Sequence, residues 1–163
     1  MALGRTDGPT AIILTRQKLP VLDRSRLAPA AGARRGGYVL HEPAGGPQAI
    51  LIATGSEVPV ALEAARVLEG DGIGARVVSL PSWEWFEAQP QAWRDEVLPP
   101  AITARVSVEA ASTFGWCRWT TDRGVSAGLD RFGASAPGER LFQEFGFTAE
   151  RVAGLVRRFL AGR

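Results

Sequence analysis

Thr54, Gly55 and Ser56 form the turn in which this sequence best places backbone groups to bind a ligand. The turn follows an apolar run and precedes a segment of helical periodicity, and free backbone N–H groups at a helix start attract anions. It lacks the spaced glycines and the lysine of known nucleotide-binding loops. Glu57 adds a carboxylate at the same positive helix end. One interpretation is an anion site, and the other is a helix cap, through Ser56 or a Thr54–Glu57 capping box.

Arg16 is the side chain best suited to bind a phosphate group. The short apolar run Ala11–Thr15 predicts a strand, and Arg16 follows at its carboxyl end. A guanidinium in that position can hold a phosphate through two parallel hydrogen bonds. Taken alone, a solvated surface charge is the simpler interpretation of Arg16.

Residues for acid–base, nucleophilic or metal chemistry are few. The chain has one histidine, His41, and one cysteine, Cys117, so we predict neither a catalytic triad nor a zinc site. His41 is expected at the surface, and Cys117, among bulky aromatic residues, is expected to be a buried thiol. A single cysteine excludes an internal disulfide and fits the reducing cytoplasm. Glu109 follows a predicted strand, where it can act as an acid or anchor a loop, and we favour the anchor.

The segment from Gln48 to Leu80 must position the Thr54–Ser56 turn. Ala49–Ala53 predicts a strand buried on both faces, and a later run, Arg76–Leu80, predicts a second strand. Between them an amphipathic helix is predicted, with its apolar stripe at Val58, Ala61, Leu62, Ala65 and Leu68. Such a βαβ unit has parallel strands. We therefore predict an α/β three-layer sandwich, with a mostly parallel central sheet and helices on both faces.

Further elements extend this unit in both directions. Tyr38–Glu42 predicts a strand that enters the sheet as a β-hairpin with Ala49–Ala53. Other predicted elements are strands at Thr103–Glu109 and Gly124–Leu129, and helices after Ser82, at Gln91–Leu98, at Glu139–Phe145 and after Thr148. The five tryptophans suit either a core or a partner surface.

Composition limits the classes of partner. The 163 residues, 45% hydrophobic and 22% charged, suit one domain with an appendage. No apolar run approaches the roughly 18 residues of a membrane helix, and no secretory signal is visible. The net charge is +2, with 19 basic and 17 acidic residues interleaved along the chain. We therefore expect neither a membrane nor a nucleic-acid partner.

Several motifs resemble those of transketolases. Residues 8–20 resemble the strand that closes the family's middle, pyrimidine-binding domain, and Ile50–Val58 resembles the start of its C-terminal domain. Later landmarks of that domain are similar to Pro81–Glu84, Leu98–Pro100, Asp130–Pro137 and Phe145–Thr148. These motifs occur in the family's order and cover the chain almost end to end.

The resemblance implies a cytoplasmic homodimer of the pentose phosphate pathway that transfers a two-carbon ketol unit between sugar phosphates. Its cofactor is thiamine diphosphate with Mg²⁺ or Ca²⁺. The family holds this cofactor in its N-terminal and middle domains, so in this chain we expect no cofactor, no metal and no catalytic residue. Arg16 matches the arginine that binds the phosphate of the sugar substrate. The isolated chain is expected to be inactive, with a role in domain packing and dimer assembly.

The resemblance also divides the chain. Residues 1–35 match a remnant of the middle domain plus a linker, and residues 36–163 match the C-terminal domain. The expected partners are the remaining transketolase domains or subunit. One alternative is a regulatory module that binds a small ligand near Thr54 and Ser79–Ser82. Another is the equivalent domain of a different thiamine diphosphate enzyme, such as a deoxyxylulose phosphate synthase, although the motif at Pro81–Glu84 favours transketolase.

Overall fold

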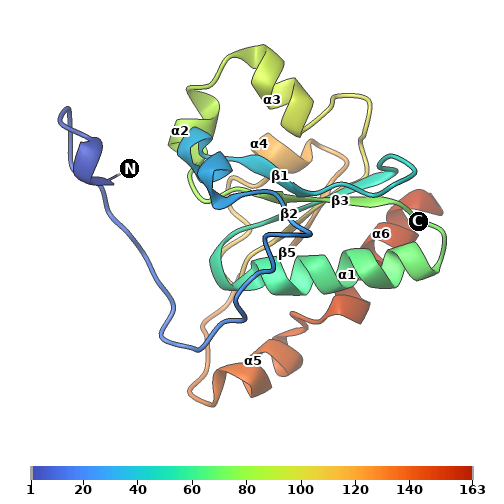
Figure 1. Cartoon of the computed structure of the whole chain (residues 1–163). Coiled ribbons are helices and arrows are strands. Elements are labelled where there is room, and N and C mark those ends of the chain that lie inside the picture. Colours follow the sequence, from blue (N-terminus) through green and yellow to red (C-terminus); the bar gives the residue numbers. More distant parts are fainter. Residues whose placement is uncertain (1, 163) are drawn as a thin grey trace.

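The five apolar residues Ala49–Ala53 form β2, the central strand of the sheet, and all five are buried. The computed structural model describes residues 2–162 (Figure 1). Its five strands run in the order β1-β3-β2-β4-β5. The others are β1 (Tyr38–His41), β3 (Ala75–Ser79), β4 (Arg105–Val108) and β5 (Val125–Ala127). β1 alone is antiparallel to its neighbour, so the predicted mostly parallel sheet is confirmed.

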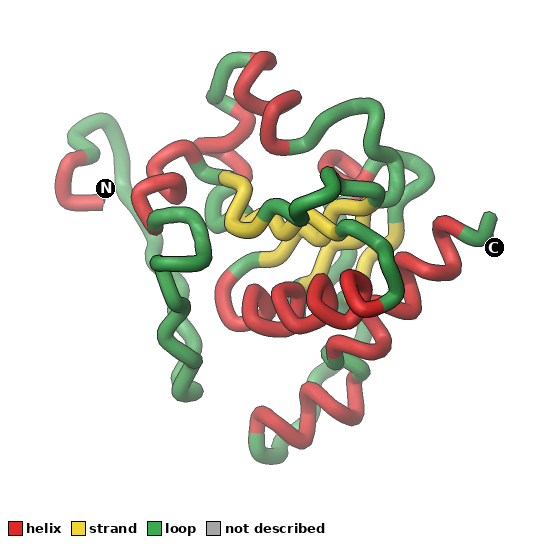
Figure 2. Tube along the Cα trace, turned by 45° about the vertical axis from the view of Figure 1, so that its right-hand side comes forward, coloured by secondary structure: helices red, strands yellow, loops and turns green. Residues whose placement is uncertain are grey.

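Helices cover both faces of the sheet, as predicted. One layer contains α1 (Val58–Gly70), α5 (Gly138–Phe145) and α6 (Ala149–Leu160), and the other contains α2 (Trp83–Glu87), α3 (Gln91–Val97) and α4 (Cys117–Thr120) (Figures 1 and 2). Successive side chains of β2 point to opposite faces of the sheet and therefore pack against both helical layers. Leu51 packs in the core under α1 and α6, while Ile50 and Ile52 pack with the aromatic residues of α2 and α4.

The predicted βαβ unit is present, but its helix start differs from the prediction. Four residues of the apolar stripe are buried and Leu62 is half-buried. A 3-10 turn, Gly55–Glu57, joins β2 to α1, and neither Thr54 nor Glu57 caps the helix through its side chain. The predicted caps are therefore wrong. Ser56 lies inside this turn, and its hydroxyl donates to Glu57 Oε1 at 2.7 Å.

The predicted hairpin between β1 and β2 is also wrong. Both edges of β2 are already paired in parallel, with β3 and with β4. β1 therefore cannot pair with β2, and it joins the outer edge of β3, where it runs antiparallel. An ion pair stabilises this pairing of β1 with β3. Arg76 of β3 donates through Nε and Nη2 to the two carboxylate oxygens of Glu42, which directly follows β1, at 2.6 and 2.9 Å.

Two predicted helix caps are confirmed. The Ser82 hydroxyl accepts from the Trp85 backbone N–H at 3.3 Å and starts α2. The Thr148 hydroxyl accepts from the Arg151 backbone N–H at 3.3 Å and starts α6. Each cap fixes where a helix meets the sheet. None of the helices within residues 2–162 is long and apolar enough to cross a bilayer.

The amino-terminal arm before residue 22 lies away from the sheet (dark blue in Figure 1). The strand predicted at Ala11–Thr15 is not formed there, because the described part of the chain offers it no neighbouring strand. Its apolar side chains are consequently exposed: Ile12 to 66%, Ile13 to 94% and Leu14 to 81%. This arm is the largest departure from the predicted elements.

Candidate functional site

The carboxyl ends of β2 and β4 form the natural ligand-binding edge of the sheet. The chain leaves β2 through α1 on one face and leaves β4 through α4 on the other. Open α/β sheets bind ligands at such a switch point. Ala53 pairs with Val108 in the sheet, so the Thr54–Ser56 turn lies beside Glu109.

A buried carboxylate occupies this edge. Glu57 is only 5% exposed, and it accepts hydrogen bonds from the Ser56 hydroxyl and the Ala110 backbone N–H. Burial raises the pKa of Glu57, and the nearby Glu109 carboxylate raises it further. A carboxyl group therefore already lies where a phosphate would meet the helix start. The anion site at Thr54, Gly55 and Ser56 stays a prediction, with Glu57 opposing it.

Glu109 anchors a loop, as favoured from the sequence. Its Oε2 accepts from Trp116 Nε1 at 2.8 Å, which ties the end of β4 to the start of α4. Asp130 completes the arrangement, because its carboxylate accepts from the Thr113 backbone N–H at 2.8 Å and from the Thr113 hydroxyl at 2.6 Å. These bonds hold the pKa of Asp130 below its ordinary value. Both carboxylates position loops.

The lone histidine and cysteine serve different roles. His41 Nε2 lies 2.9 Å from Glu69 Oε1, so the side chain joins β1 to the end of α1. Cys117 is exposed, and the predicted buried thiol is wrong. In α4 the neighbouring Trp116 and Trp119, three residues apart, face the sheet and are buried, which turns Cys117 outward.

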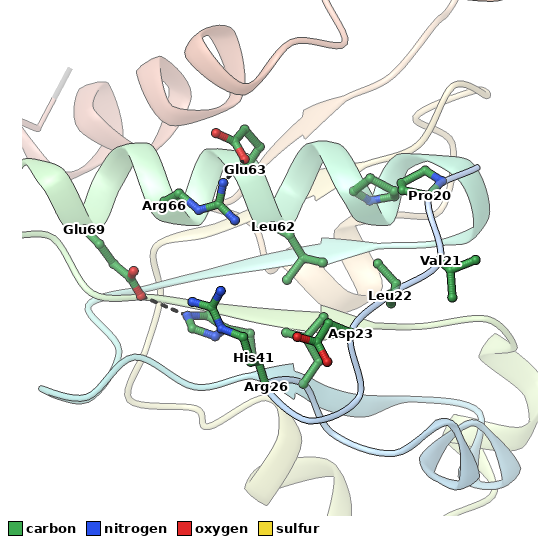
Figure 3. Close-up of a pocket in the computed structure, with 12 residues that line it drawn as sticks. Pro20, Val21, Leu22, Asp23, Arg26, His41, Leu62, Glu63, Arg66 and Glu69 are labelled. Atoms are coloured by element: carbon green, nitrogen blue, oxygen red, sulfur yellow. Dashed lines mark hydrogen bonds and ion pairs between the residues drawn. The ribbon is translucent and has the colours of Figure 1, made fainter. Parts of the chain in front are cut away.

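A cavity of about 400 Å³ lies between residues 20–27, part of the linker that leads from the arm to β1, and the outer surface of α1 (Figure 3). Charged side chains of both signs line it, and two pairs are satisfied internally: His41 with Glu69, and Arg66 with Glu63 at 2.7 Å. Apolar side chains of the linker and α1 form the rest of the wall. The residues that line the cavity include no cysteine, serine or threonine that could act as a nucleophile.

Arg16 lies on the arm, apart from the sheet edge. Its side chain is exposed, and none of the ion pairs formed by residues 2–162 includes it. The adjacent Gln17 contacts the start of α5 at Gly138. The structure thus does not bring Arg16 and the Thr54–Ser56 turn into one site.

Two buried charges were missed from the sequence, Glu57 and Arg105. Arg105 is 6% exposed and donates hydrogen bonds of 2.8–3.0 Å to four backbone carbonyls, those of Leu98, Pro99, Ile102 and Trp119. Burial lowers the pKa of its guanidinium. An arginine inside the predicted strand Thr103–Glu109 was the available signal.

Across residues 2–162, no group of three or more His, Cys, Asp or Glu side chains is arranged to hold a metal ion. The described residues therefore do not fit a metal-dependent cofactor by themselves.

Comparison with known proteins identifies the family. The model of the transketolase-like C-terminal domain matches residues 36–148. The transketolase of Geobacillus stearothermophilus is 46% identical over 162 residues, which are 98% of this chain and 24% of that protein. This chain thus spans about a quarter of that relative's length.

Solved structures give the same result. A Pichia stipitis transketolase in complex with sedoheptulose 7-phosphate superposes with a TM-score of 0.80 at 40% identity, over 90% of this chain and 20% of that one. An inactive tetramer described as a split-gene transketolase superposes with a TM-score of 0.62 at 25% identity, over 78% of this chain and 43% of that one. The chain therefore belongs to the transketolase family and contains its C-terminal domain.

Proposed function

We propose that this chain is the C-terminal part of a thiamine diphosphate-dependent transketolase that moves a two-carbon ketol unit between sugar phosphates. The complete protein is a cytoplasmic homodimer of the pentose phosphate pathway and uses Mg²⁺ or Ca²⁺ with its cofactor. The chain's own role is to pack against the remaining domains and to support the dimer. The family match and the share of the relatives' length that it covers support this assignment.

The exposed arm is the observation that carries the proposal. Ile12, Ile13 and Leu14 form an extended apolar run that contacts no sheet within residues 2–162. Extended segments of this kind gain stability by adding a strand to another sheet. We assign residues 1–35 to the middle domain and its linker, and residues 36–163 to the C-terminal domain. The arm then completes the middle domain's sheet.

Arg16 follows that strand and is assigned to the substrate's phosphate. Its guanidinium is exposed and unpaired by any carboxylate of the described chain, so it is free to form two parallel bonds to a phosphate. When bound in the complete protein, thiamine diphosphate would supply the nucleophilic chemistry of ketol transfer. No residue of this chain is assigned to hold it, since the donor set does not fit the cofactor's metal.

A chimera tests these assignments. This chain replaces the matching C-terminal quarter of the G. stearothermophilus transketolase, and ketol transfer is measured with ribose 5-phosphate and with ribose as acceptor. Arg16→Ala should raise KM for ribose 5-phosphate by about 10- to 100-fold, the worth of a charged hydrogen-bonded pair, and leave ribose unaffected. Arg158→Ala, an exposed arginine on α6, is the matched control.

Two results would overturn the proposal. Equal effects of Arg16→Ala on both acceptors would remove the phosphate role, and an inactive but folded chimera would remove the transketolase assignment. The isolated chain should neither bind thiamine diphosphate in calorimetry nor transfer a ketol unit. Turnover by the isolated chain would contradict its proposed role in packing.

A further inference from the structure

Two exposed phenylalanines lie in neighbouring loops at the carboxyl edge of the sheet. Phe114, in the loop after β4, is 89% exposed, and Phe132, in the loop after β5, is 96% exposed. They are the only aromatic side chains among the large hydrophobic residues that the described part of the chain leaves exposed. A phenyl ring in water forgoes the free energy that burial supplies, so both rings gain stability if a partner covers them.

The carboxylate of Asp130 ties the two loops together. It accepts hydrogen bonds from the Thr113 backbone N–H at 2.8 Å and from the Ser112 hydroxyl at 3.0 Å. Phe114 directly follows Thr113, and Phe132 lies two residues after Asp130, so the two rings belong to one region of the surface, which we call the aromatic patch. Loops that are fixed before binding lose less conformational entropy when a partner covers them.

The two loops carry almost no charge. Residues 110–116 and 132–138 contain no acidic or basic residue. Asp130 is occupied between the loops, and Arg131 Cζ lies 5.1 Å from the centroid of the Phe145 ring. The core of a protein–protein interface is depleted of charge and enriched in aromatic residues, whereas nucleic-acid phosphates require basic donors. The aromatic patch therefore fits an apolar protein surface.

The amino-terminal arm indicates which protein surface lies nearby. The Gln17 side chain lies against Gly138, which ends the Phe132 loop and begins α5. Leu14 precedes Gln17 by three residues, so its backbone lies within about 11 Å of Gln17. In the proposed function, Ile12–Leu14 is a strand of the middle domain's sheet. That sheet then lies beside the Phe132 loop.

We propose that the aromatic patch docks against the middle domain of the same polypeptide in the complete protein. The proposal rests on the proposed function, because the arm must complete the middle domain's sheet. One partner then covers both groups of exposed apolar side chains. Within residues 2–162, every exposed large hydrophobic side chain except Leu160 belongs to the arm or to the patch. Aromatic anchors supply much of the binding energy of an interface, so Phe114 and Phe132 fix the orientation of the two domains.

Hydroxyl-radical footprinting measures the exposure of each ring. It compares this chain by itself with the active chimera in which the chain replaces the C-terminal quarter of the G. stearothermophilus transketolase. Oxidation of Phe114 and Phe132 should be at least about fivefold slower in the chimera, because a docked ring is shielded from water. Leu160 is the matched control and should keep its rate. It lies at the opposite end of α1 from the patch, where Arg157 pairs with Asp71.

Substitutions give a second, energetic readout. Phe114→Ser and Phe132→Ser should each change the Tm of this chain alone by less than about 1 °C, since both rings are exposed. In the chimera, each should lower the temperature of half-inactivation by about 3 °C or more. Leu160→Ser should have the same effect in both proteins.

A benzophenone photo-cross-linker in place of Phe132 identifies the partner in the chimera. Links to the middle domain within one polypeptide are expected. Links that give the mass of two chains would assign the patch to the partner subunit and overturn the proposal. Protection of both rings in the isolated chain that increases with its concentration would assign the patch to a second copy, which also contradicts it.

The activity of the chimera separates failure of this proposal from failure of the proposed function. Unchanged oxidation of Phe114 and Phe132 in a chimera that transfers the ketol unit would overturn the docking surface alone. A folded but inactive chimera would remove the proposed function, and the docking surface with it.

Discussion

Replacing Arg105 by methionine should destabilise the domain severely. The guanidinium lies between β4, the preceding loop and the end of α4, and its hydrogen bonds join these three segments. Methionine has similar length but no donor. The Pro99 carbonyl retains a bond from the Ile102 backbone N–H at 3.0 Å. The carbonyls of Leu98, Ile102 and Trp119 would lose the donor that they have in the structure.

The magnitude follows from these three carbonyls. An unsatisfied buried acceptor costs about 1–3 kcal/mol, which gives roughly 3–9 kcal/mol before compensation. Methionine carries no charge, so the folded variant no longer bears the free-energy cost of desolvating a guanidinium, and this offsets part of the loss. We expect a net loss of about 4 kcal/mol in the free energy of unfolding. For a chain of this length that loss lowers Tm by roughly 8–16 °C.

Urea unfolding followed by circular dichroism measures the effect through the shift in midpoint at constant m-value. Arg66→Met is the control, since the Arg66 side chain is 70% exposed and its loss should change stability by less than about 0.5 kcal/mol. A loss below about 1 kcal/mol for Arg105→Met would refute the reasoning. It would mean that water replaces the guanidinium at these carbonyls at little cost.

Two smaller changes have equally definite signs. Because burial raises the pKa of Glu57 above 4.5, its ionised form costs stability at neutral pH, and that cost fades as pH falls toward 4.5. The Tm of Glu57→Gln relative to the parent should therefore increase between pH 4.5 and pH 7, and a difference independent of pH would contradict this. Thr148→Ala removes the cap of α6 and should cost about 1 kcal/mol in urea unfolding, while Thr148→Ser, which keeps the hydroxyl, should cost much less.

The layers of the fold could be predicted from the sequence because local patterns determine them. The buried run Ala49–Ala53 and the apolar stripe of α1 correctly indicated a parallel βαβ unit. Ser82 and Thr148 were correct caps because each lies in extended backbone directly before its helix, where the hydroxyl oxygen can accept from a backbone N–H of the first turn. Ser56 failed as a cap because it lies inside the 3-10 turn Gly55–Glu57 and not in extended backbone before the helix, and no local pattern indicated that turn.

Features that depend on distant parts of the chain could not be predicted. The pairing of β1 depends on both edges of β2 being occupied, which no local pattern encodes. The Ala11–Thr15 run has the composition of a strand, but a strand also needs a neighbour. A second cavity, lined in part by Arg94 and Arg118, likewise depends on how α3 and α4 pack. Sequence spacing gave no sign that these two side chains line one cavity.

An irregularity in the pairing of β1 should disfavour self-association through the border of the sheet. β1 lies at the border of the sheet, where an unpaired strand edge can recruit a strand from another molecule. Its register shifts between Val39 and His41, which disrupts the ladder that an incoming strand would extend. The linker also occupies part of this border, since the Ala28 backbone N–H donates to the Leu40 carbonyl at 3.0 Å. Deleting the linker should therefore promote aggregation through this border even where the domain itself remains folded.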